Sequence, residues 1–384
     1  MKANKGEWSE LYAFVKLLKE GKIYAADENV ERIENIFFPI MKLYREEVAG
    51  SSVEYQTGEI IRIYKNGSLI TEIDSSELLE PTSKLYKEIT ERKSSDKGAF
   101  EIESADAIMQ KMSITKVKAP SADKSDIKMR IHDIHTGYES DVGFSIKSDL
   151  GNPPTLLNAG SNTNFVYEIF GIDDADMNEI NSIDKSISKT YMIDRMNKLF
   201  ELASDVKFFK MADETYECNL MMIDSMFPEI YGDFILNHYK HLSESISGCV
   251  ELCDLLVKSN PLGIRNPEVF YKYKFKKMLC ASALGMTPGK NWNGIDDASG
   301  GYIIVKRDGD VLCYHLYNRN FFEEYLLRNT QVDRPSASRY DYAYVFKEDG
   351  RYFIRFNVQI RFKSISSSTT NDRLMAYFTK LNNK

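Results

Sequence analysis

Two alternating segments decide how this chain folds: Asp126-Ile-Lys-Met-Arg-Ile-His-Asp-Ile-His135 and Tyr138-Glu-Ser-Asp-Val-Gly-Phe-Ser-Ile-Lys147, separated by Thr136-Gly137. Apolar residues at every second position on both sides of a possible turn predict two antiparallel strands. With Thr136-Gly137 as a two-residue turn, Ile131 faces Val142, Met129 faces Phe144, and Ile127 faces Ile146. All these pairs lie on one side of the sheet, which favours this register over a one-residue slip.

The other side of the predicted hairpin is polar. In this register Asp126 lies opposite Lys147, and Lys128 lies opposite Ser145. Phosphodiester hydrolysis needs a hard cation held by oxygen ligands, and a nearby lysine can orient the attacking water. Asp126 as a cation ligand and Lys147 as the water-orienting amine fit these roles. A longer loop with a bulge would shift the partners by a position or two, and a solvated Asp–Lys pair on a surface hairpin is the alternative interpretation.

Asp141 is a second candidate ligand, because its side chain has the same facing parity as Ser145 and Lys147. On a straight strand, however, Asp141 lies roughly 20 Å from Lys147. We therefore rank Asp126 first and keep Asp141 as the fallback, for the case that the strand bends sharply or the register differs.

Composition places the chain among ordinary globular proteins. Its 384 residues are 43% hydrophobic and 28% charged, which allows two or three structural units with a core. The net charge of −7 argues against a basic surface over the whole chain, although a cleft needs only local positive potential. The polar N-terminus and the absence of a long apolar stretch predict a cytoplasmic protein without a membrane partner. The five cysteines contain no CxxC pair, so we expect reduced thiols and no zinc site.

The rest of the pattern predicts an α/β (α+β) organisation with four regions. We expect a nuclease-sized core at 1–171, a helical region at 172–290, a β-rich region at 291–363 that completes the sheet or reads DNA, and a flexible tail at 364–384. Within the core, helices are predicted at Gly6–Glu20, Ser76–Lys93 and Glu103–Met112, a helix or helix–strand segment at Glu28–Arg45, and a hairpin around Lys65-Asn66-Gly67. C-terminal strands are predicted at Gly301–Val305, Val311–Tyr317, Tyr342–Phe346 and Tyr352–Phe362.

The segment ending in Ser145-Ile-Lys147 resembles the PD-(D/E)XK nuclease superfamily. In that superfamily an acid begins one strand and an acid-x-Lys follows on the next, after a helix that bears a glutamate. Here Asp126 is followed, after eighteen residues, by Ser145-x-Lys147. The resemblance implies a nuclease core with a mixed sheet, a magnesium ion bound by Asp126 and the carbonyl of residue 146, and catalysis by Lys147. Ser145 would hydrogen-bond the water shell of the metal.

Ser145 stands where the superfamily has an acid, so the resemblance implies a carboxylate recruited from elsewhere. The candidates are Glu10 on the first helix, which is similar to the N-terminal helix glutamate of the superfamily, and Glu168 after the hairpin. A solvated helix acid, or a partner of the helix dipole, is the alternative interpretation of Glu10.

A narrower resemblance is to HpaII-type restriction endonucleases. The segments that carry it are Lys5-Gly-Glu-Trp-Ser-Glu-Leu11, Gly143-Phe-Ser-Ile-Lys-Ser148, Leu150-Gly-Asn-Pro-Pro-Thr-Leu-Leu-Asn158, Thr163-Asn-Phe165, Arg334-Pro-Ser-Ala-Ser-Arg-Tyr-Asp-Tyr342 and Asn357-Val-Gln-Ile-Arg-Phe362. This resemblance implies magnesium-dependent cleavage of double-stranded DNA at a short palindrome such as CCGG. It also implies a DNA methyltransferase as a genetic neighbour, and a homodimer is expected because cutting both strands usually needs two active sites.

Several polar residues are candidates for contacts with DNA. Arg334 and Arg339 flank a serine-rich turn and have the chemistry to reach guanine edges, and Arg355 could line the backbone channel. The remaining candidates are Lys128 and Arg130 on the hairpin, Asn158 and Asn164 after it, and Lys274 within Tyr271-Lys-Tyr-Lys-Phe-Lys-Lys277. The alternatives are ordinary surface arginines, an amphipathic helix with solvated lysines, and Asn164 as the cap of a helix over Phe165–Phe170.

Three other functions fit parts of this pattern. A structure-selective repair nuclease would share the core, and cleavage of unbroken duplex at one defined sequence would exclude it. A non-catalytic DNA-binding protein with a decayed site is compatible with Ser145, and cleavage that Lys147→Ala abolishes would exclude it. A structural or partner-binding protein suits the acidic net charge, and failure to bind any duplex at low salt would favour it.

Overall fold

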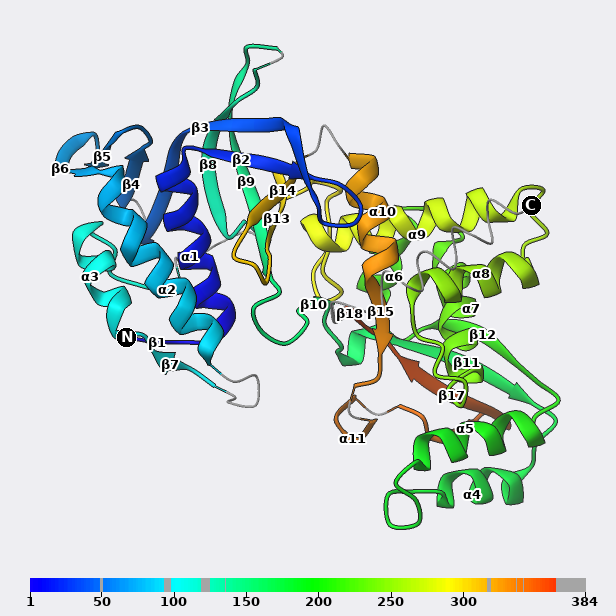
Figure 1. The fold of residues 1–384 in the computed structure, drawn as a ribbon. Helices are drawn as coiled ribbons and strands as arrows, with labels where there is room; N and C mark the ends of the chain where they lie inside the picture. The colour runs from blue at the N-terminus through cyan, green and yellow to red at the C-terminus, as the bar shows by residue number, and fades with distance from the viewer. Residues whose placement is uncertain are drawn as a thin grey trace, which may run out of the picture.

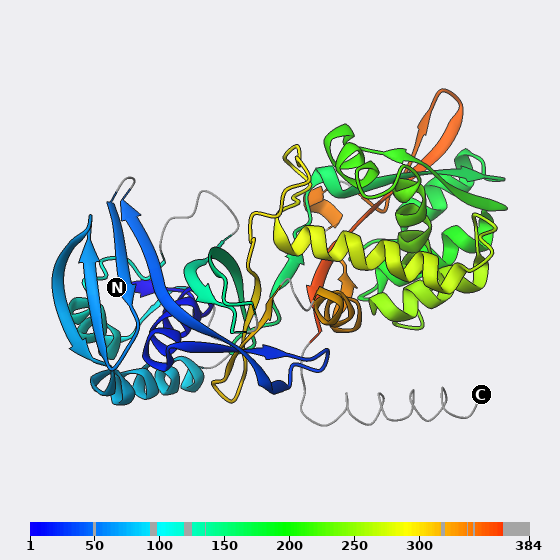
Figure 2. The same cartoon turned by 90° about the horizontal axis from the view of Figure 1, so that it is seen from above.

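The computed structural model describes residues 1–48, 51–92, 98–118, 125–134, 136–315, 319–335, 337–340 and 342–363. It has a mixed α/β fold drawn out into two lobes, as Figures 1 and 2 show. Each lobe has its own hydrophobic core. Between the lobes lies a short sheet of β10 (Thr155–Leu157), β18 (Gln359–Phe362) and β15 (Thr330–Asp333). The tail predicted at 364–384 lies outside the described residues.

The first helix, α1 (Lys5–Glu20), begins and ends at strong capping signals. The side chain of Asn4 accepts a hydrogen bond from the backbone of Glu7, and the Glu7 carboxylate accepts one from the backbone of Asn4. Gly21 ends the helix with φ 65°, a conformation that glycine adopts at little cost. The first predicted helix is therefore confirmed. The next two predicted helices are also confirmed, at α2 (Leu79–Glu91) and α3 (Glu103–Lys111).

A large mixed sheet forms the rest of the first lobe. Among the described residues it has nine strands, in the order β2 (Lys22–Ala26), β14 (Val311–His315), β13 (Gly301–Val305), β9 (Glu139–Ser148), β8 (Ile127–His132), β3 (Arg32–Val48), β4 (Ser51–Gln56), β5 (Ile60–Lys65) and β6 (Ser68–Asp74). Because β2 also pairs with β3, the strands from β2 to β3 close into a ring. A small separate pair, β1 (Lys2–Ala3) and β7 (Phe100–Glu101), lies beside them.

One predicted helix is a strand. The segment assigned to a helix or a helix–strand unit at Glu28–Arg45 forms β3, which pairs with β2, β4 and β8. Pro39 lies in its middle and would break a helix, and the flanking isoleucine and phenylalanine residues favour a strand. The hairpin predicted around Lys65-Asn66-Gly67 is confirmed as β5–β6, with φ 49° at Asn66 and 82° at Gly67.

The register predicted for the β8–β9 hairpin is wrong by two positions. Ile127 pairs with Phe144, Met129 with Val142, and Lys128 with Gly143. The reason is a longer loop: the Asp133 N–H donates to the Tyr138 carbonyl at 2.9 Å, and the Gly137 N–H donates to the Asp133 carbonyl at 2.7 Å. Since the shift is an even number of residues, the apolar side chains keep their common face. Asp126 now lies beside Ser145 instead of opposite Lys147.

The β13–β14 hairpin joins the two lobes. Every residue of both strands is buried, and successive side chains alternate between the cores. Tyr302 and Ile304 belong to the core of the second lobe, whereas Ile303 and Val305 belong to the core of the first. Strand β13 also pairs in parallel with β9, so β9 has a partner on each edge.

The second lobe contains most of the helices, among them those of the segment 173–284 that the pattern predicted as mainly helical. Its helices are α4 (Asp174–Ser182), α5 (Tyr191–Leu202), α6 (Glu214–Met221), α7 (Phe227–Lys240), α8 (Cys249–Ser259), α9 (Pro267–Leu284), α10 (Arg319–Asn329) and α11 (Ala337–Tyr340). A sheet of β12 (Asp205–Met211), β11 (Asn164–Phe170), β17 (Arg351–Asn357) and β16 (Val345–Glu348) supports them. The segment Phe165–Phe170, considered above as a helix, is therefore strand β11, whose alternate residues pack on α7.

Within the described part of the chain, no helix has both the length and the apolar character needed to cross a bilayer.

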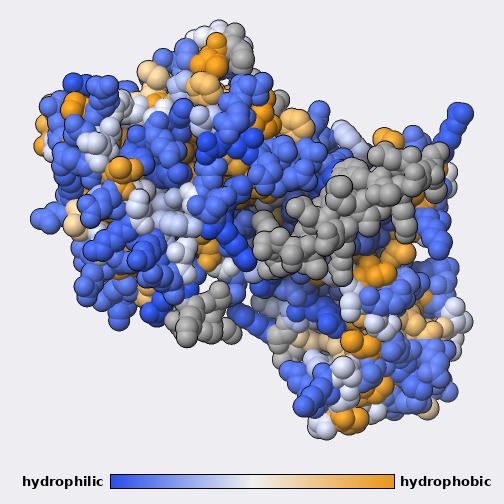
Figure 3. Space-filling model, viewed as in Figure 1, coloured by the Kyte–Doolittle hydropathy of each residue, from blue (hydrophilic) through white to orange (hydrophobic). Residues whose placement is uncertain are grey.

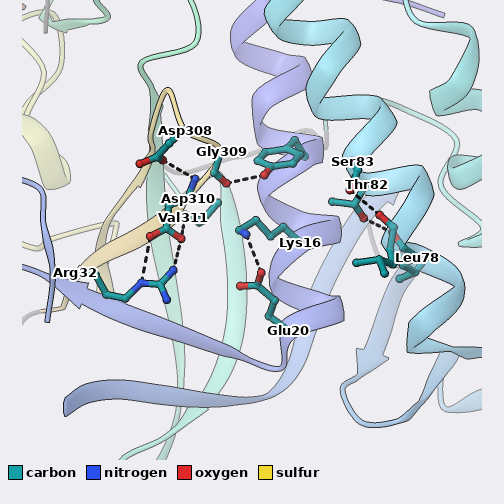
Figure 4. Close-up of polar contacts among 12 residues, drawn as sticks. Lys16, Glu20, Arg32, Leu78, Thr82, Ser83, Asp308, Gly309, Asp310 and Val311 are labelled. Carbon is teal, nitrogen blue, oxygen red and sulfur yellow. Dashed lines mark hydrogen bonds and ion pairs between the residues drawn. The ribbon is translucent and has the colours of Figure 1, made fainter. Parts of the chain in front are cut away.

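The tip of the β13–β14 hairpin is held by polar contacts (Figure 4). Arg32 donates to the Asp310 carboxylate at 2.7 Å and 3.2 Å. From α1, the buried Tyr12 hydroxyl donates to the Gly309 carbonyl at 2.6 Å. From α2, the more exposed Tyr86 hydroxyl donates to the Arg307 carbonyl at 2.5 Å.

We predict that Tyr12→Phe lowers the free energy of unfolding by about 1–2 kcal/mol, because the buried Gly309 carbonyl loses its partner. Tyr86→Phe is the matched control and should cost less, since water can replace an exposed hydroxyl. Urea unfolding of both variants measures the difference. Equal losses would contradict the buried role assigned to Tyr12.

Candidate active site

The polar side chains of interest converge where α1 crosses β9. The two elements are tied together by Ser148, whose hydroxyl donates to the Ser9 hydroxyl at 2.8 Å. Ser9 is fully buried and in turn donates to the Lys5 carbonyl at 2.7 Å. This contact fixes the face of α1 that carries Glu10 against the end of β9 that carries Lys147.

Asp126 begins β8 and points back onto β9. Its carboxylate accepts a hydrogen bond from the Ile146 N–H at 2.7 Å and another from the Ser145 hydroxyl at 3.2 Å. The Asp126 N–H donates to the Phe144 carbonyl at 2.9 Å, which extends the ladder by one residue. Ser145 was predicted to bond a metal's water shell, but here its buried hydroxyl is directed to Asp126. This follows from the two-residue shift in register.

Glu10, Asp126 and Lys147 influence one another electrostatically. The pKa of Glu10 is raised to about 7, mainly by burial and also by the nearby carboxylates of Asp126 and Glu7, whereas Lys118, whose ammonium lies 3.6 Å from Glu10, acts in the opposite direction. Burial lowers the pKa of Lys147, and Asp126 and Glu10 act in the opposite direction. Within the described residues, no carboxylate lies within 4 Å of the Lys147 ammonium. The site therefore holds two carboxylates and an amine as neighbours without a closed ion pair between acid and Lys147.

A cavity of about 400 Å³ opens beside these groups. Its lining combines Glu10, Ile146 and Lys147 with basic and small residues: Asn4, Lys5, Gly6, Arg92, Gly98, Phe100, Ser148, Gly151, Asn152 and Pro154. Lys5 and Arg92 bring positive charge to this cavity and were not predicted as site residues. Lys5 lies in the segment quoted for the restriction-enzyme resemblance, which was a usable signal. Arg92 follows α2 and carries no sequence signal.

Two predicted carboxylate ligands lie elsewhere. Asp141 accepts hydrogen bonds from Arg130 at 2.6 Å and 2.9 Å and from the Tyr44 hydroxyl at 2.9 Å. Glu168 lies on β11, in a different sheet from Lys147, and its carboxylate is 3.4 Å from Arg351. Neither residue lines the cavity, so of the candidates for the missing acid only Glu10 is brought to Asp126.

The lysines of α9 are neutralised by neighbouring acids. Lys272 lies 3.0 Å from Asp254, Lys277 lies 2.6 Å from Glu323, and Lys274 and Lys276 are paired with Asp224 and Glu324. Arg130 is likewise occupied by Asp141. These pairings argue against Lys274 and Arg130 as free phosphate contacts.

The remaining candidates for DNA contacts differ in exposure. Asn158, Lys128, Arg334 and Arg339 are exposed, whereas the Arg355 guanidinium lies 4.4 Å from the centre of the Phe346 ring. Asn164 is buried, with its side chain bonded to Tyr340 and Asn357. Figure 3 shows the surface hollowed between the two lobes, with hydrophilic residues along the edges of the hollow. In Figure 1, α11 lies across this gap from α1 and β9.

Two neighbouring carboxylates beside a lysine offer the oxygen ligands and the positive charge that metal-dependent phosphodiester hydrolysis uses. The family described as HpaII restriction endonuclease matches residues 4–362. The chain is 36% identical, over 363 residues, to the type II restriction enzyme HpaII of Haemophilus parainfluenzae, covering 94% of this chain and 98% of that enzyme. No solved structure matches. The chain is thus a type II restriction endonuclease, a site-specific DNA-cleaving enzyme. It belongs to the HpaII restriction endonuclease family.

The contact between Gly143 and Ser125 generates a prediction about Asp126. A Cβ atom at position 143 would lie 2.2 Å from the Ser125 hydroxyl oxygen and 2.9 Å from its Cβ. We expect Gly143→Ala to displace Ser125 and the adjacent Asp126, and to slow DNA cleavage about a hundredfold through misplacement of the site. Adding Ser125→Gly should restore most of the rate, because it removes the two nearest atoms, and the next nearest, the Asp297 carbonyl oxygen, lies at 3.7 Å, an ordinary van der Waals contact.

Cleavage rates at saturating DNA, with thermal unfolding in parallel, measure this effect. Ser125→Gly alone is the control, since it removes the hydroxyl that donates to the Asp297 carbonyl at 2.9 Å. A double variant no faster than Gly143→Ala would show that the clash is not the cause.

Proposed function

We propose that this endonuclease cleaves duplex DNA on a PD-(D/E)XK-type core, with Asp126 and Glu10 binding Mg²⁺ and Lys147 orienting the attacking water. The observation that supports this most directly is that Glu10 and Lys147 line one cavity, and that Asp126 accepts a hydrogen bond from the N–H of Ile146, which lines the same cavity. The three side chains come from the start of β8, from α1 and from β9, and the Glu10 and Lys147 pKa values each respond to Asp126.

The donor set suits a hard divalent cation. Carboxylate and carbonyl oxygens are the ligands that Mg²⁺ prefers, and two acids held together in a buried place repel one another until a cation lies between them. Glu10 takes the place of the acid that is missing at Ser145, and the Ile146 carbonyl is a further candidate ligand. When bound, Mg²⁺ polarises the scissile phosphate and lowers the pKa of its own water.

The protein's own groups would prepare this chemistry. The Ile146 N–H and the Ser145 hydroxyl hold the Asp126 carboxylate in one orientation. Lys147, free of a close acid, can offer its ammonium to the attacking water and to charge that develops on the phosphate. Lys5 and Arg92 line the same cavity and would attract the DNA backbone.

We further propose that the target is a short palindrome such as CCGG, read by the exposed loop residues Asn158, Arg334 and Arg339 from the far side of the hollow. Exposed arginines have the donor geometry that guanine edges accept. The enzyme would act in the cytoplasm as a homodimer, beside a DNA methyltransferase encoded nearby that protects the host sites. Incubation of a plasmid with the enzyme and Mg²⁺, followed by sequencing of the ends, tests the target.

Lys147→Ala should reduce cleavage by at least about a hundredfold while DNA affinity in Ca²⁺ stays within a few fold, because the amine acts on the reacting groups. The control is Lys42→Ala, which removes a lysine from neighbouring β3 that is paired with Glu54 at 2.8 Å. Plasmid cleavage and gel-shift binding give the two readouts. Normal cleavage by Lys147→Ala would overturn the assigned role.

Mg²⁺ binding should depend on pH through Glu10. Since the Glu10 pKa is about 7 without metal, the carboxyl must lose a proton before it binds the cation. Stabilisation by Mg²⁺, measured as a rise in Tm, should therefore increase from about pH 6 to about pH 8. Without metal, stability should change with pH in the opposite direction. Because the Glu10 pKa is raised in the folded state, Glu10 contributes to stability at low pH, and this contribution is lost as the pH rises through 7.

Glu10→Gln should remove both trends, and Glu20→Gln on the same helix is the control, because Glu20 is not among the charges that shift the Glu10 pKa. A Tm rise with Mg²⁺ that is equal in the Glu10→Gln variant and the parent enzyme would count against Glu10 as a ligand.

A further inference from the structure

Two loops meet at one end of the β11–β17 strand pair, and a pair of buried asparagines joins them. The first loop is 158–163, and the described parts of the second are 334–335 and 337–340, the latter being α11. We propose that Asn164 and Asn357 are positioning residues that hold these loops together as one recognition element for the base edges of duplex DNA. The inference rests on the proposed reading of DNA by Asn158, Arg334 and Arg339.

Asn357 holds the first loop. It is fully buried, and its amide nitrogen donates to the Gly160 carbonyl at 2.7 Å and to the Asn164 side-chain oxygen at 2.6 Å. Its own side-chain oxygen accepts from the buried Thr163 hydroxyl at 3.3 Å. Thr163 also exchanges hydrogen bonds at 3.0 Å with the backbone of Gly160. The loop is thereby closed on itself and fastened to β17.

Asn164 carries the connection to the second loop. It is 4% exposed, and its amide nitrogen donates to the Tyr340 carbonyl at 2.9 Å, directly after Arg339. From beyond the end of the second loop, the buried Tyr342 hydroxyl donates to the Pro335 carbonyl at 2.7 Å, next to Arg334. A continuous chain of hydrogen bonds thus runs from the Gly160 backbone through Asn357 and Asn164 to the Tyr340 backbone.

Stability alone does not account for this network of buried asparagines. The neighbouring paired positions are Phe165 and Phe356, both fully buried, so apolar side chains would also fill this end of the sheet. A buried side-chain amide lowers stability unless all its hydrogen-bond partners are present. Because the partners here are backbone groups of both loops, the amides are satisfied only when the two backbones are in one relative position. What the amide pair adds is a defined geometry between the loops.

The exposed side of the same loops carries the proposed DNA contacts. Asn158, Arg334 and Arg339 are exposed, whereas the anchoring residues are buried beneath them. Hydrogen bonds to base edges discriminate between sequences only when donor positions are held closely, and preorganised loops lose less entropy on binding. The buried amides would therefore act on specificity through the exposed side chains, without touching DNA.

The decisive variant is Asn164→Asp. It keeps an oxygen that can accept from Asn357 but removes the donor to the Tyr340 carbonyl. The matched control is Asn181→Asp, because Asn181 also donates to a backbone carbonyl and accepts from a backbone N–H, both of Val345, at 2.8 Å and 2.9 Å. Thr163→Val gives an independent test, because it removes the hydroxyl that bonds to the Gly160 backbone and to the Asn357 side chain in the first loop.

The experiment is a plasmid digest in Mg²⁺, followed by sequencing of all cut ends. The measured quantity is the ratio of cuts at the preferred site to cuts at sites that differ from it by one base pair. We expect that ratio to fall about tenfold in Asn164→Asp and in Thr163→Val, with KM raised and the rate at saturating DNA within a few fold of the parent enzyme. Asn181→Asp should leave the ratio unchanged at a comparable Tm.

The outcomes separate the inference from the function on which it rests. If Arg334→Ala and Arg339→Ala lower the ratio but Asn164→Asp and Thr163→Val do not, the positioning role is wrong and the reading role stands. If the arginine variants leave the ratio unchanged, the loops do not read DNA and the inference fails with them. A fall in Asn181→Asp equal to that in Asn164→Asp would also overturn it, because the effect would then follow general destabilisation.

Discussion

The constraint on which the structure depends is the double-sided burial of the β13–β14 hairpin. Side chains on a strand alternate between two faces, and here each face is covered by a different core. Tyr302 packs with the second lobe while Ile303, its neighbour, packs with the first. Because β13 is also the parallel partner of β9, the strand that carries Lys147 is held on both edges and cannot move independently of either lobe. The lobe that carries Glu10 and Lys147 and the lobe that carries the exposed arginines therefore share one buried hairpin.

Electrostatics gives this rigid frame its chemical character. Burial raises the pKa of Glu10 and lowers that of Lys147, so each group is held where its charged form is less favourable than in water. The lysines of α9, and Arg130 with Asp141, are neutralised by close partners. At the site, Lys147 and Asp126 are neighbours that do not close into an ion pair, so the site is suited to take up further charged groups, and a metal ion with a DNA phosphate would complete it.

The positions of individual site residues were predictable to different degrees. The alternation of the hairpin pointed to Asp126 and Lys147. Although the register was wrong by two residues, a shift by an even number leaves each side chain on the same face of the sheet, so the two residues still lie in the same region. The shift itself came from backbone hydrogen bonds around Asp133, which no side-chain pattern reveals. Asn164 shows the opposite difficulty. An exposed amide and a buried one look the same in sequence, and only the partners of Asn164 distinguish a base-reading side chain from an internal anchor.

By itself, the sequence determined the alternation of β8 and β9 and the first helix, α1, because these depend on residues close together in the chain. It also determined the membership of the family. The tertiary structure alone decided which of the two candidate acids lies near Asp126. Glu168 lies on β11 in another sheet, whereas Glu10 lies on α1, which packs against β9. Contacts between residues more than a hundred positions apart depend on how whole helices and strands pack. That packing is determined by many side chains together, so no single sequence motif predicts it.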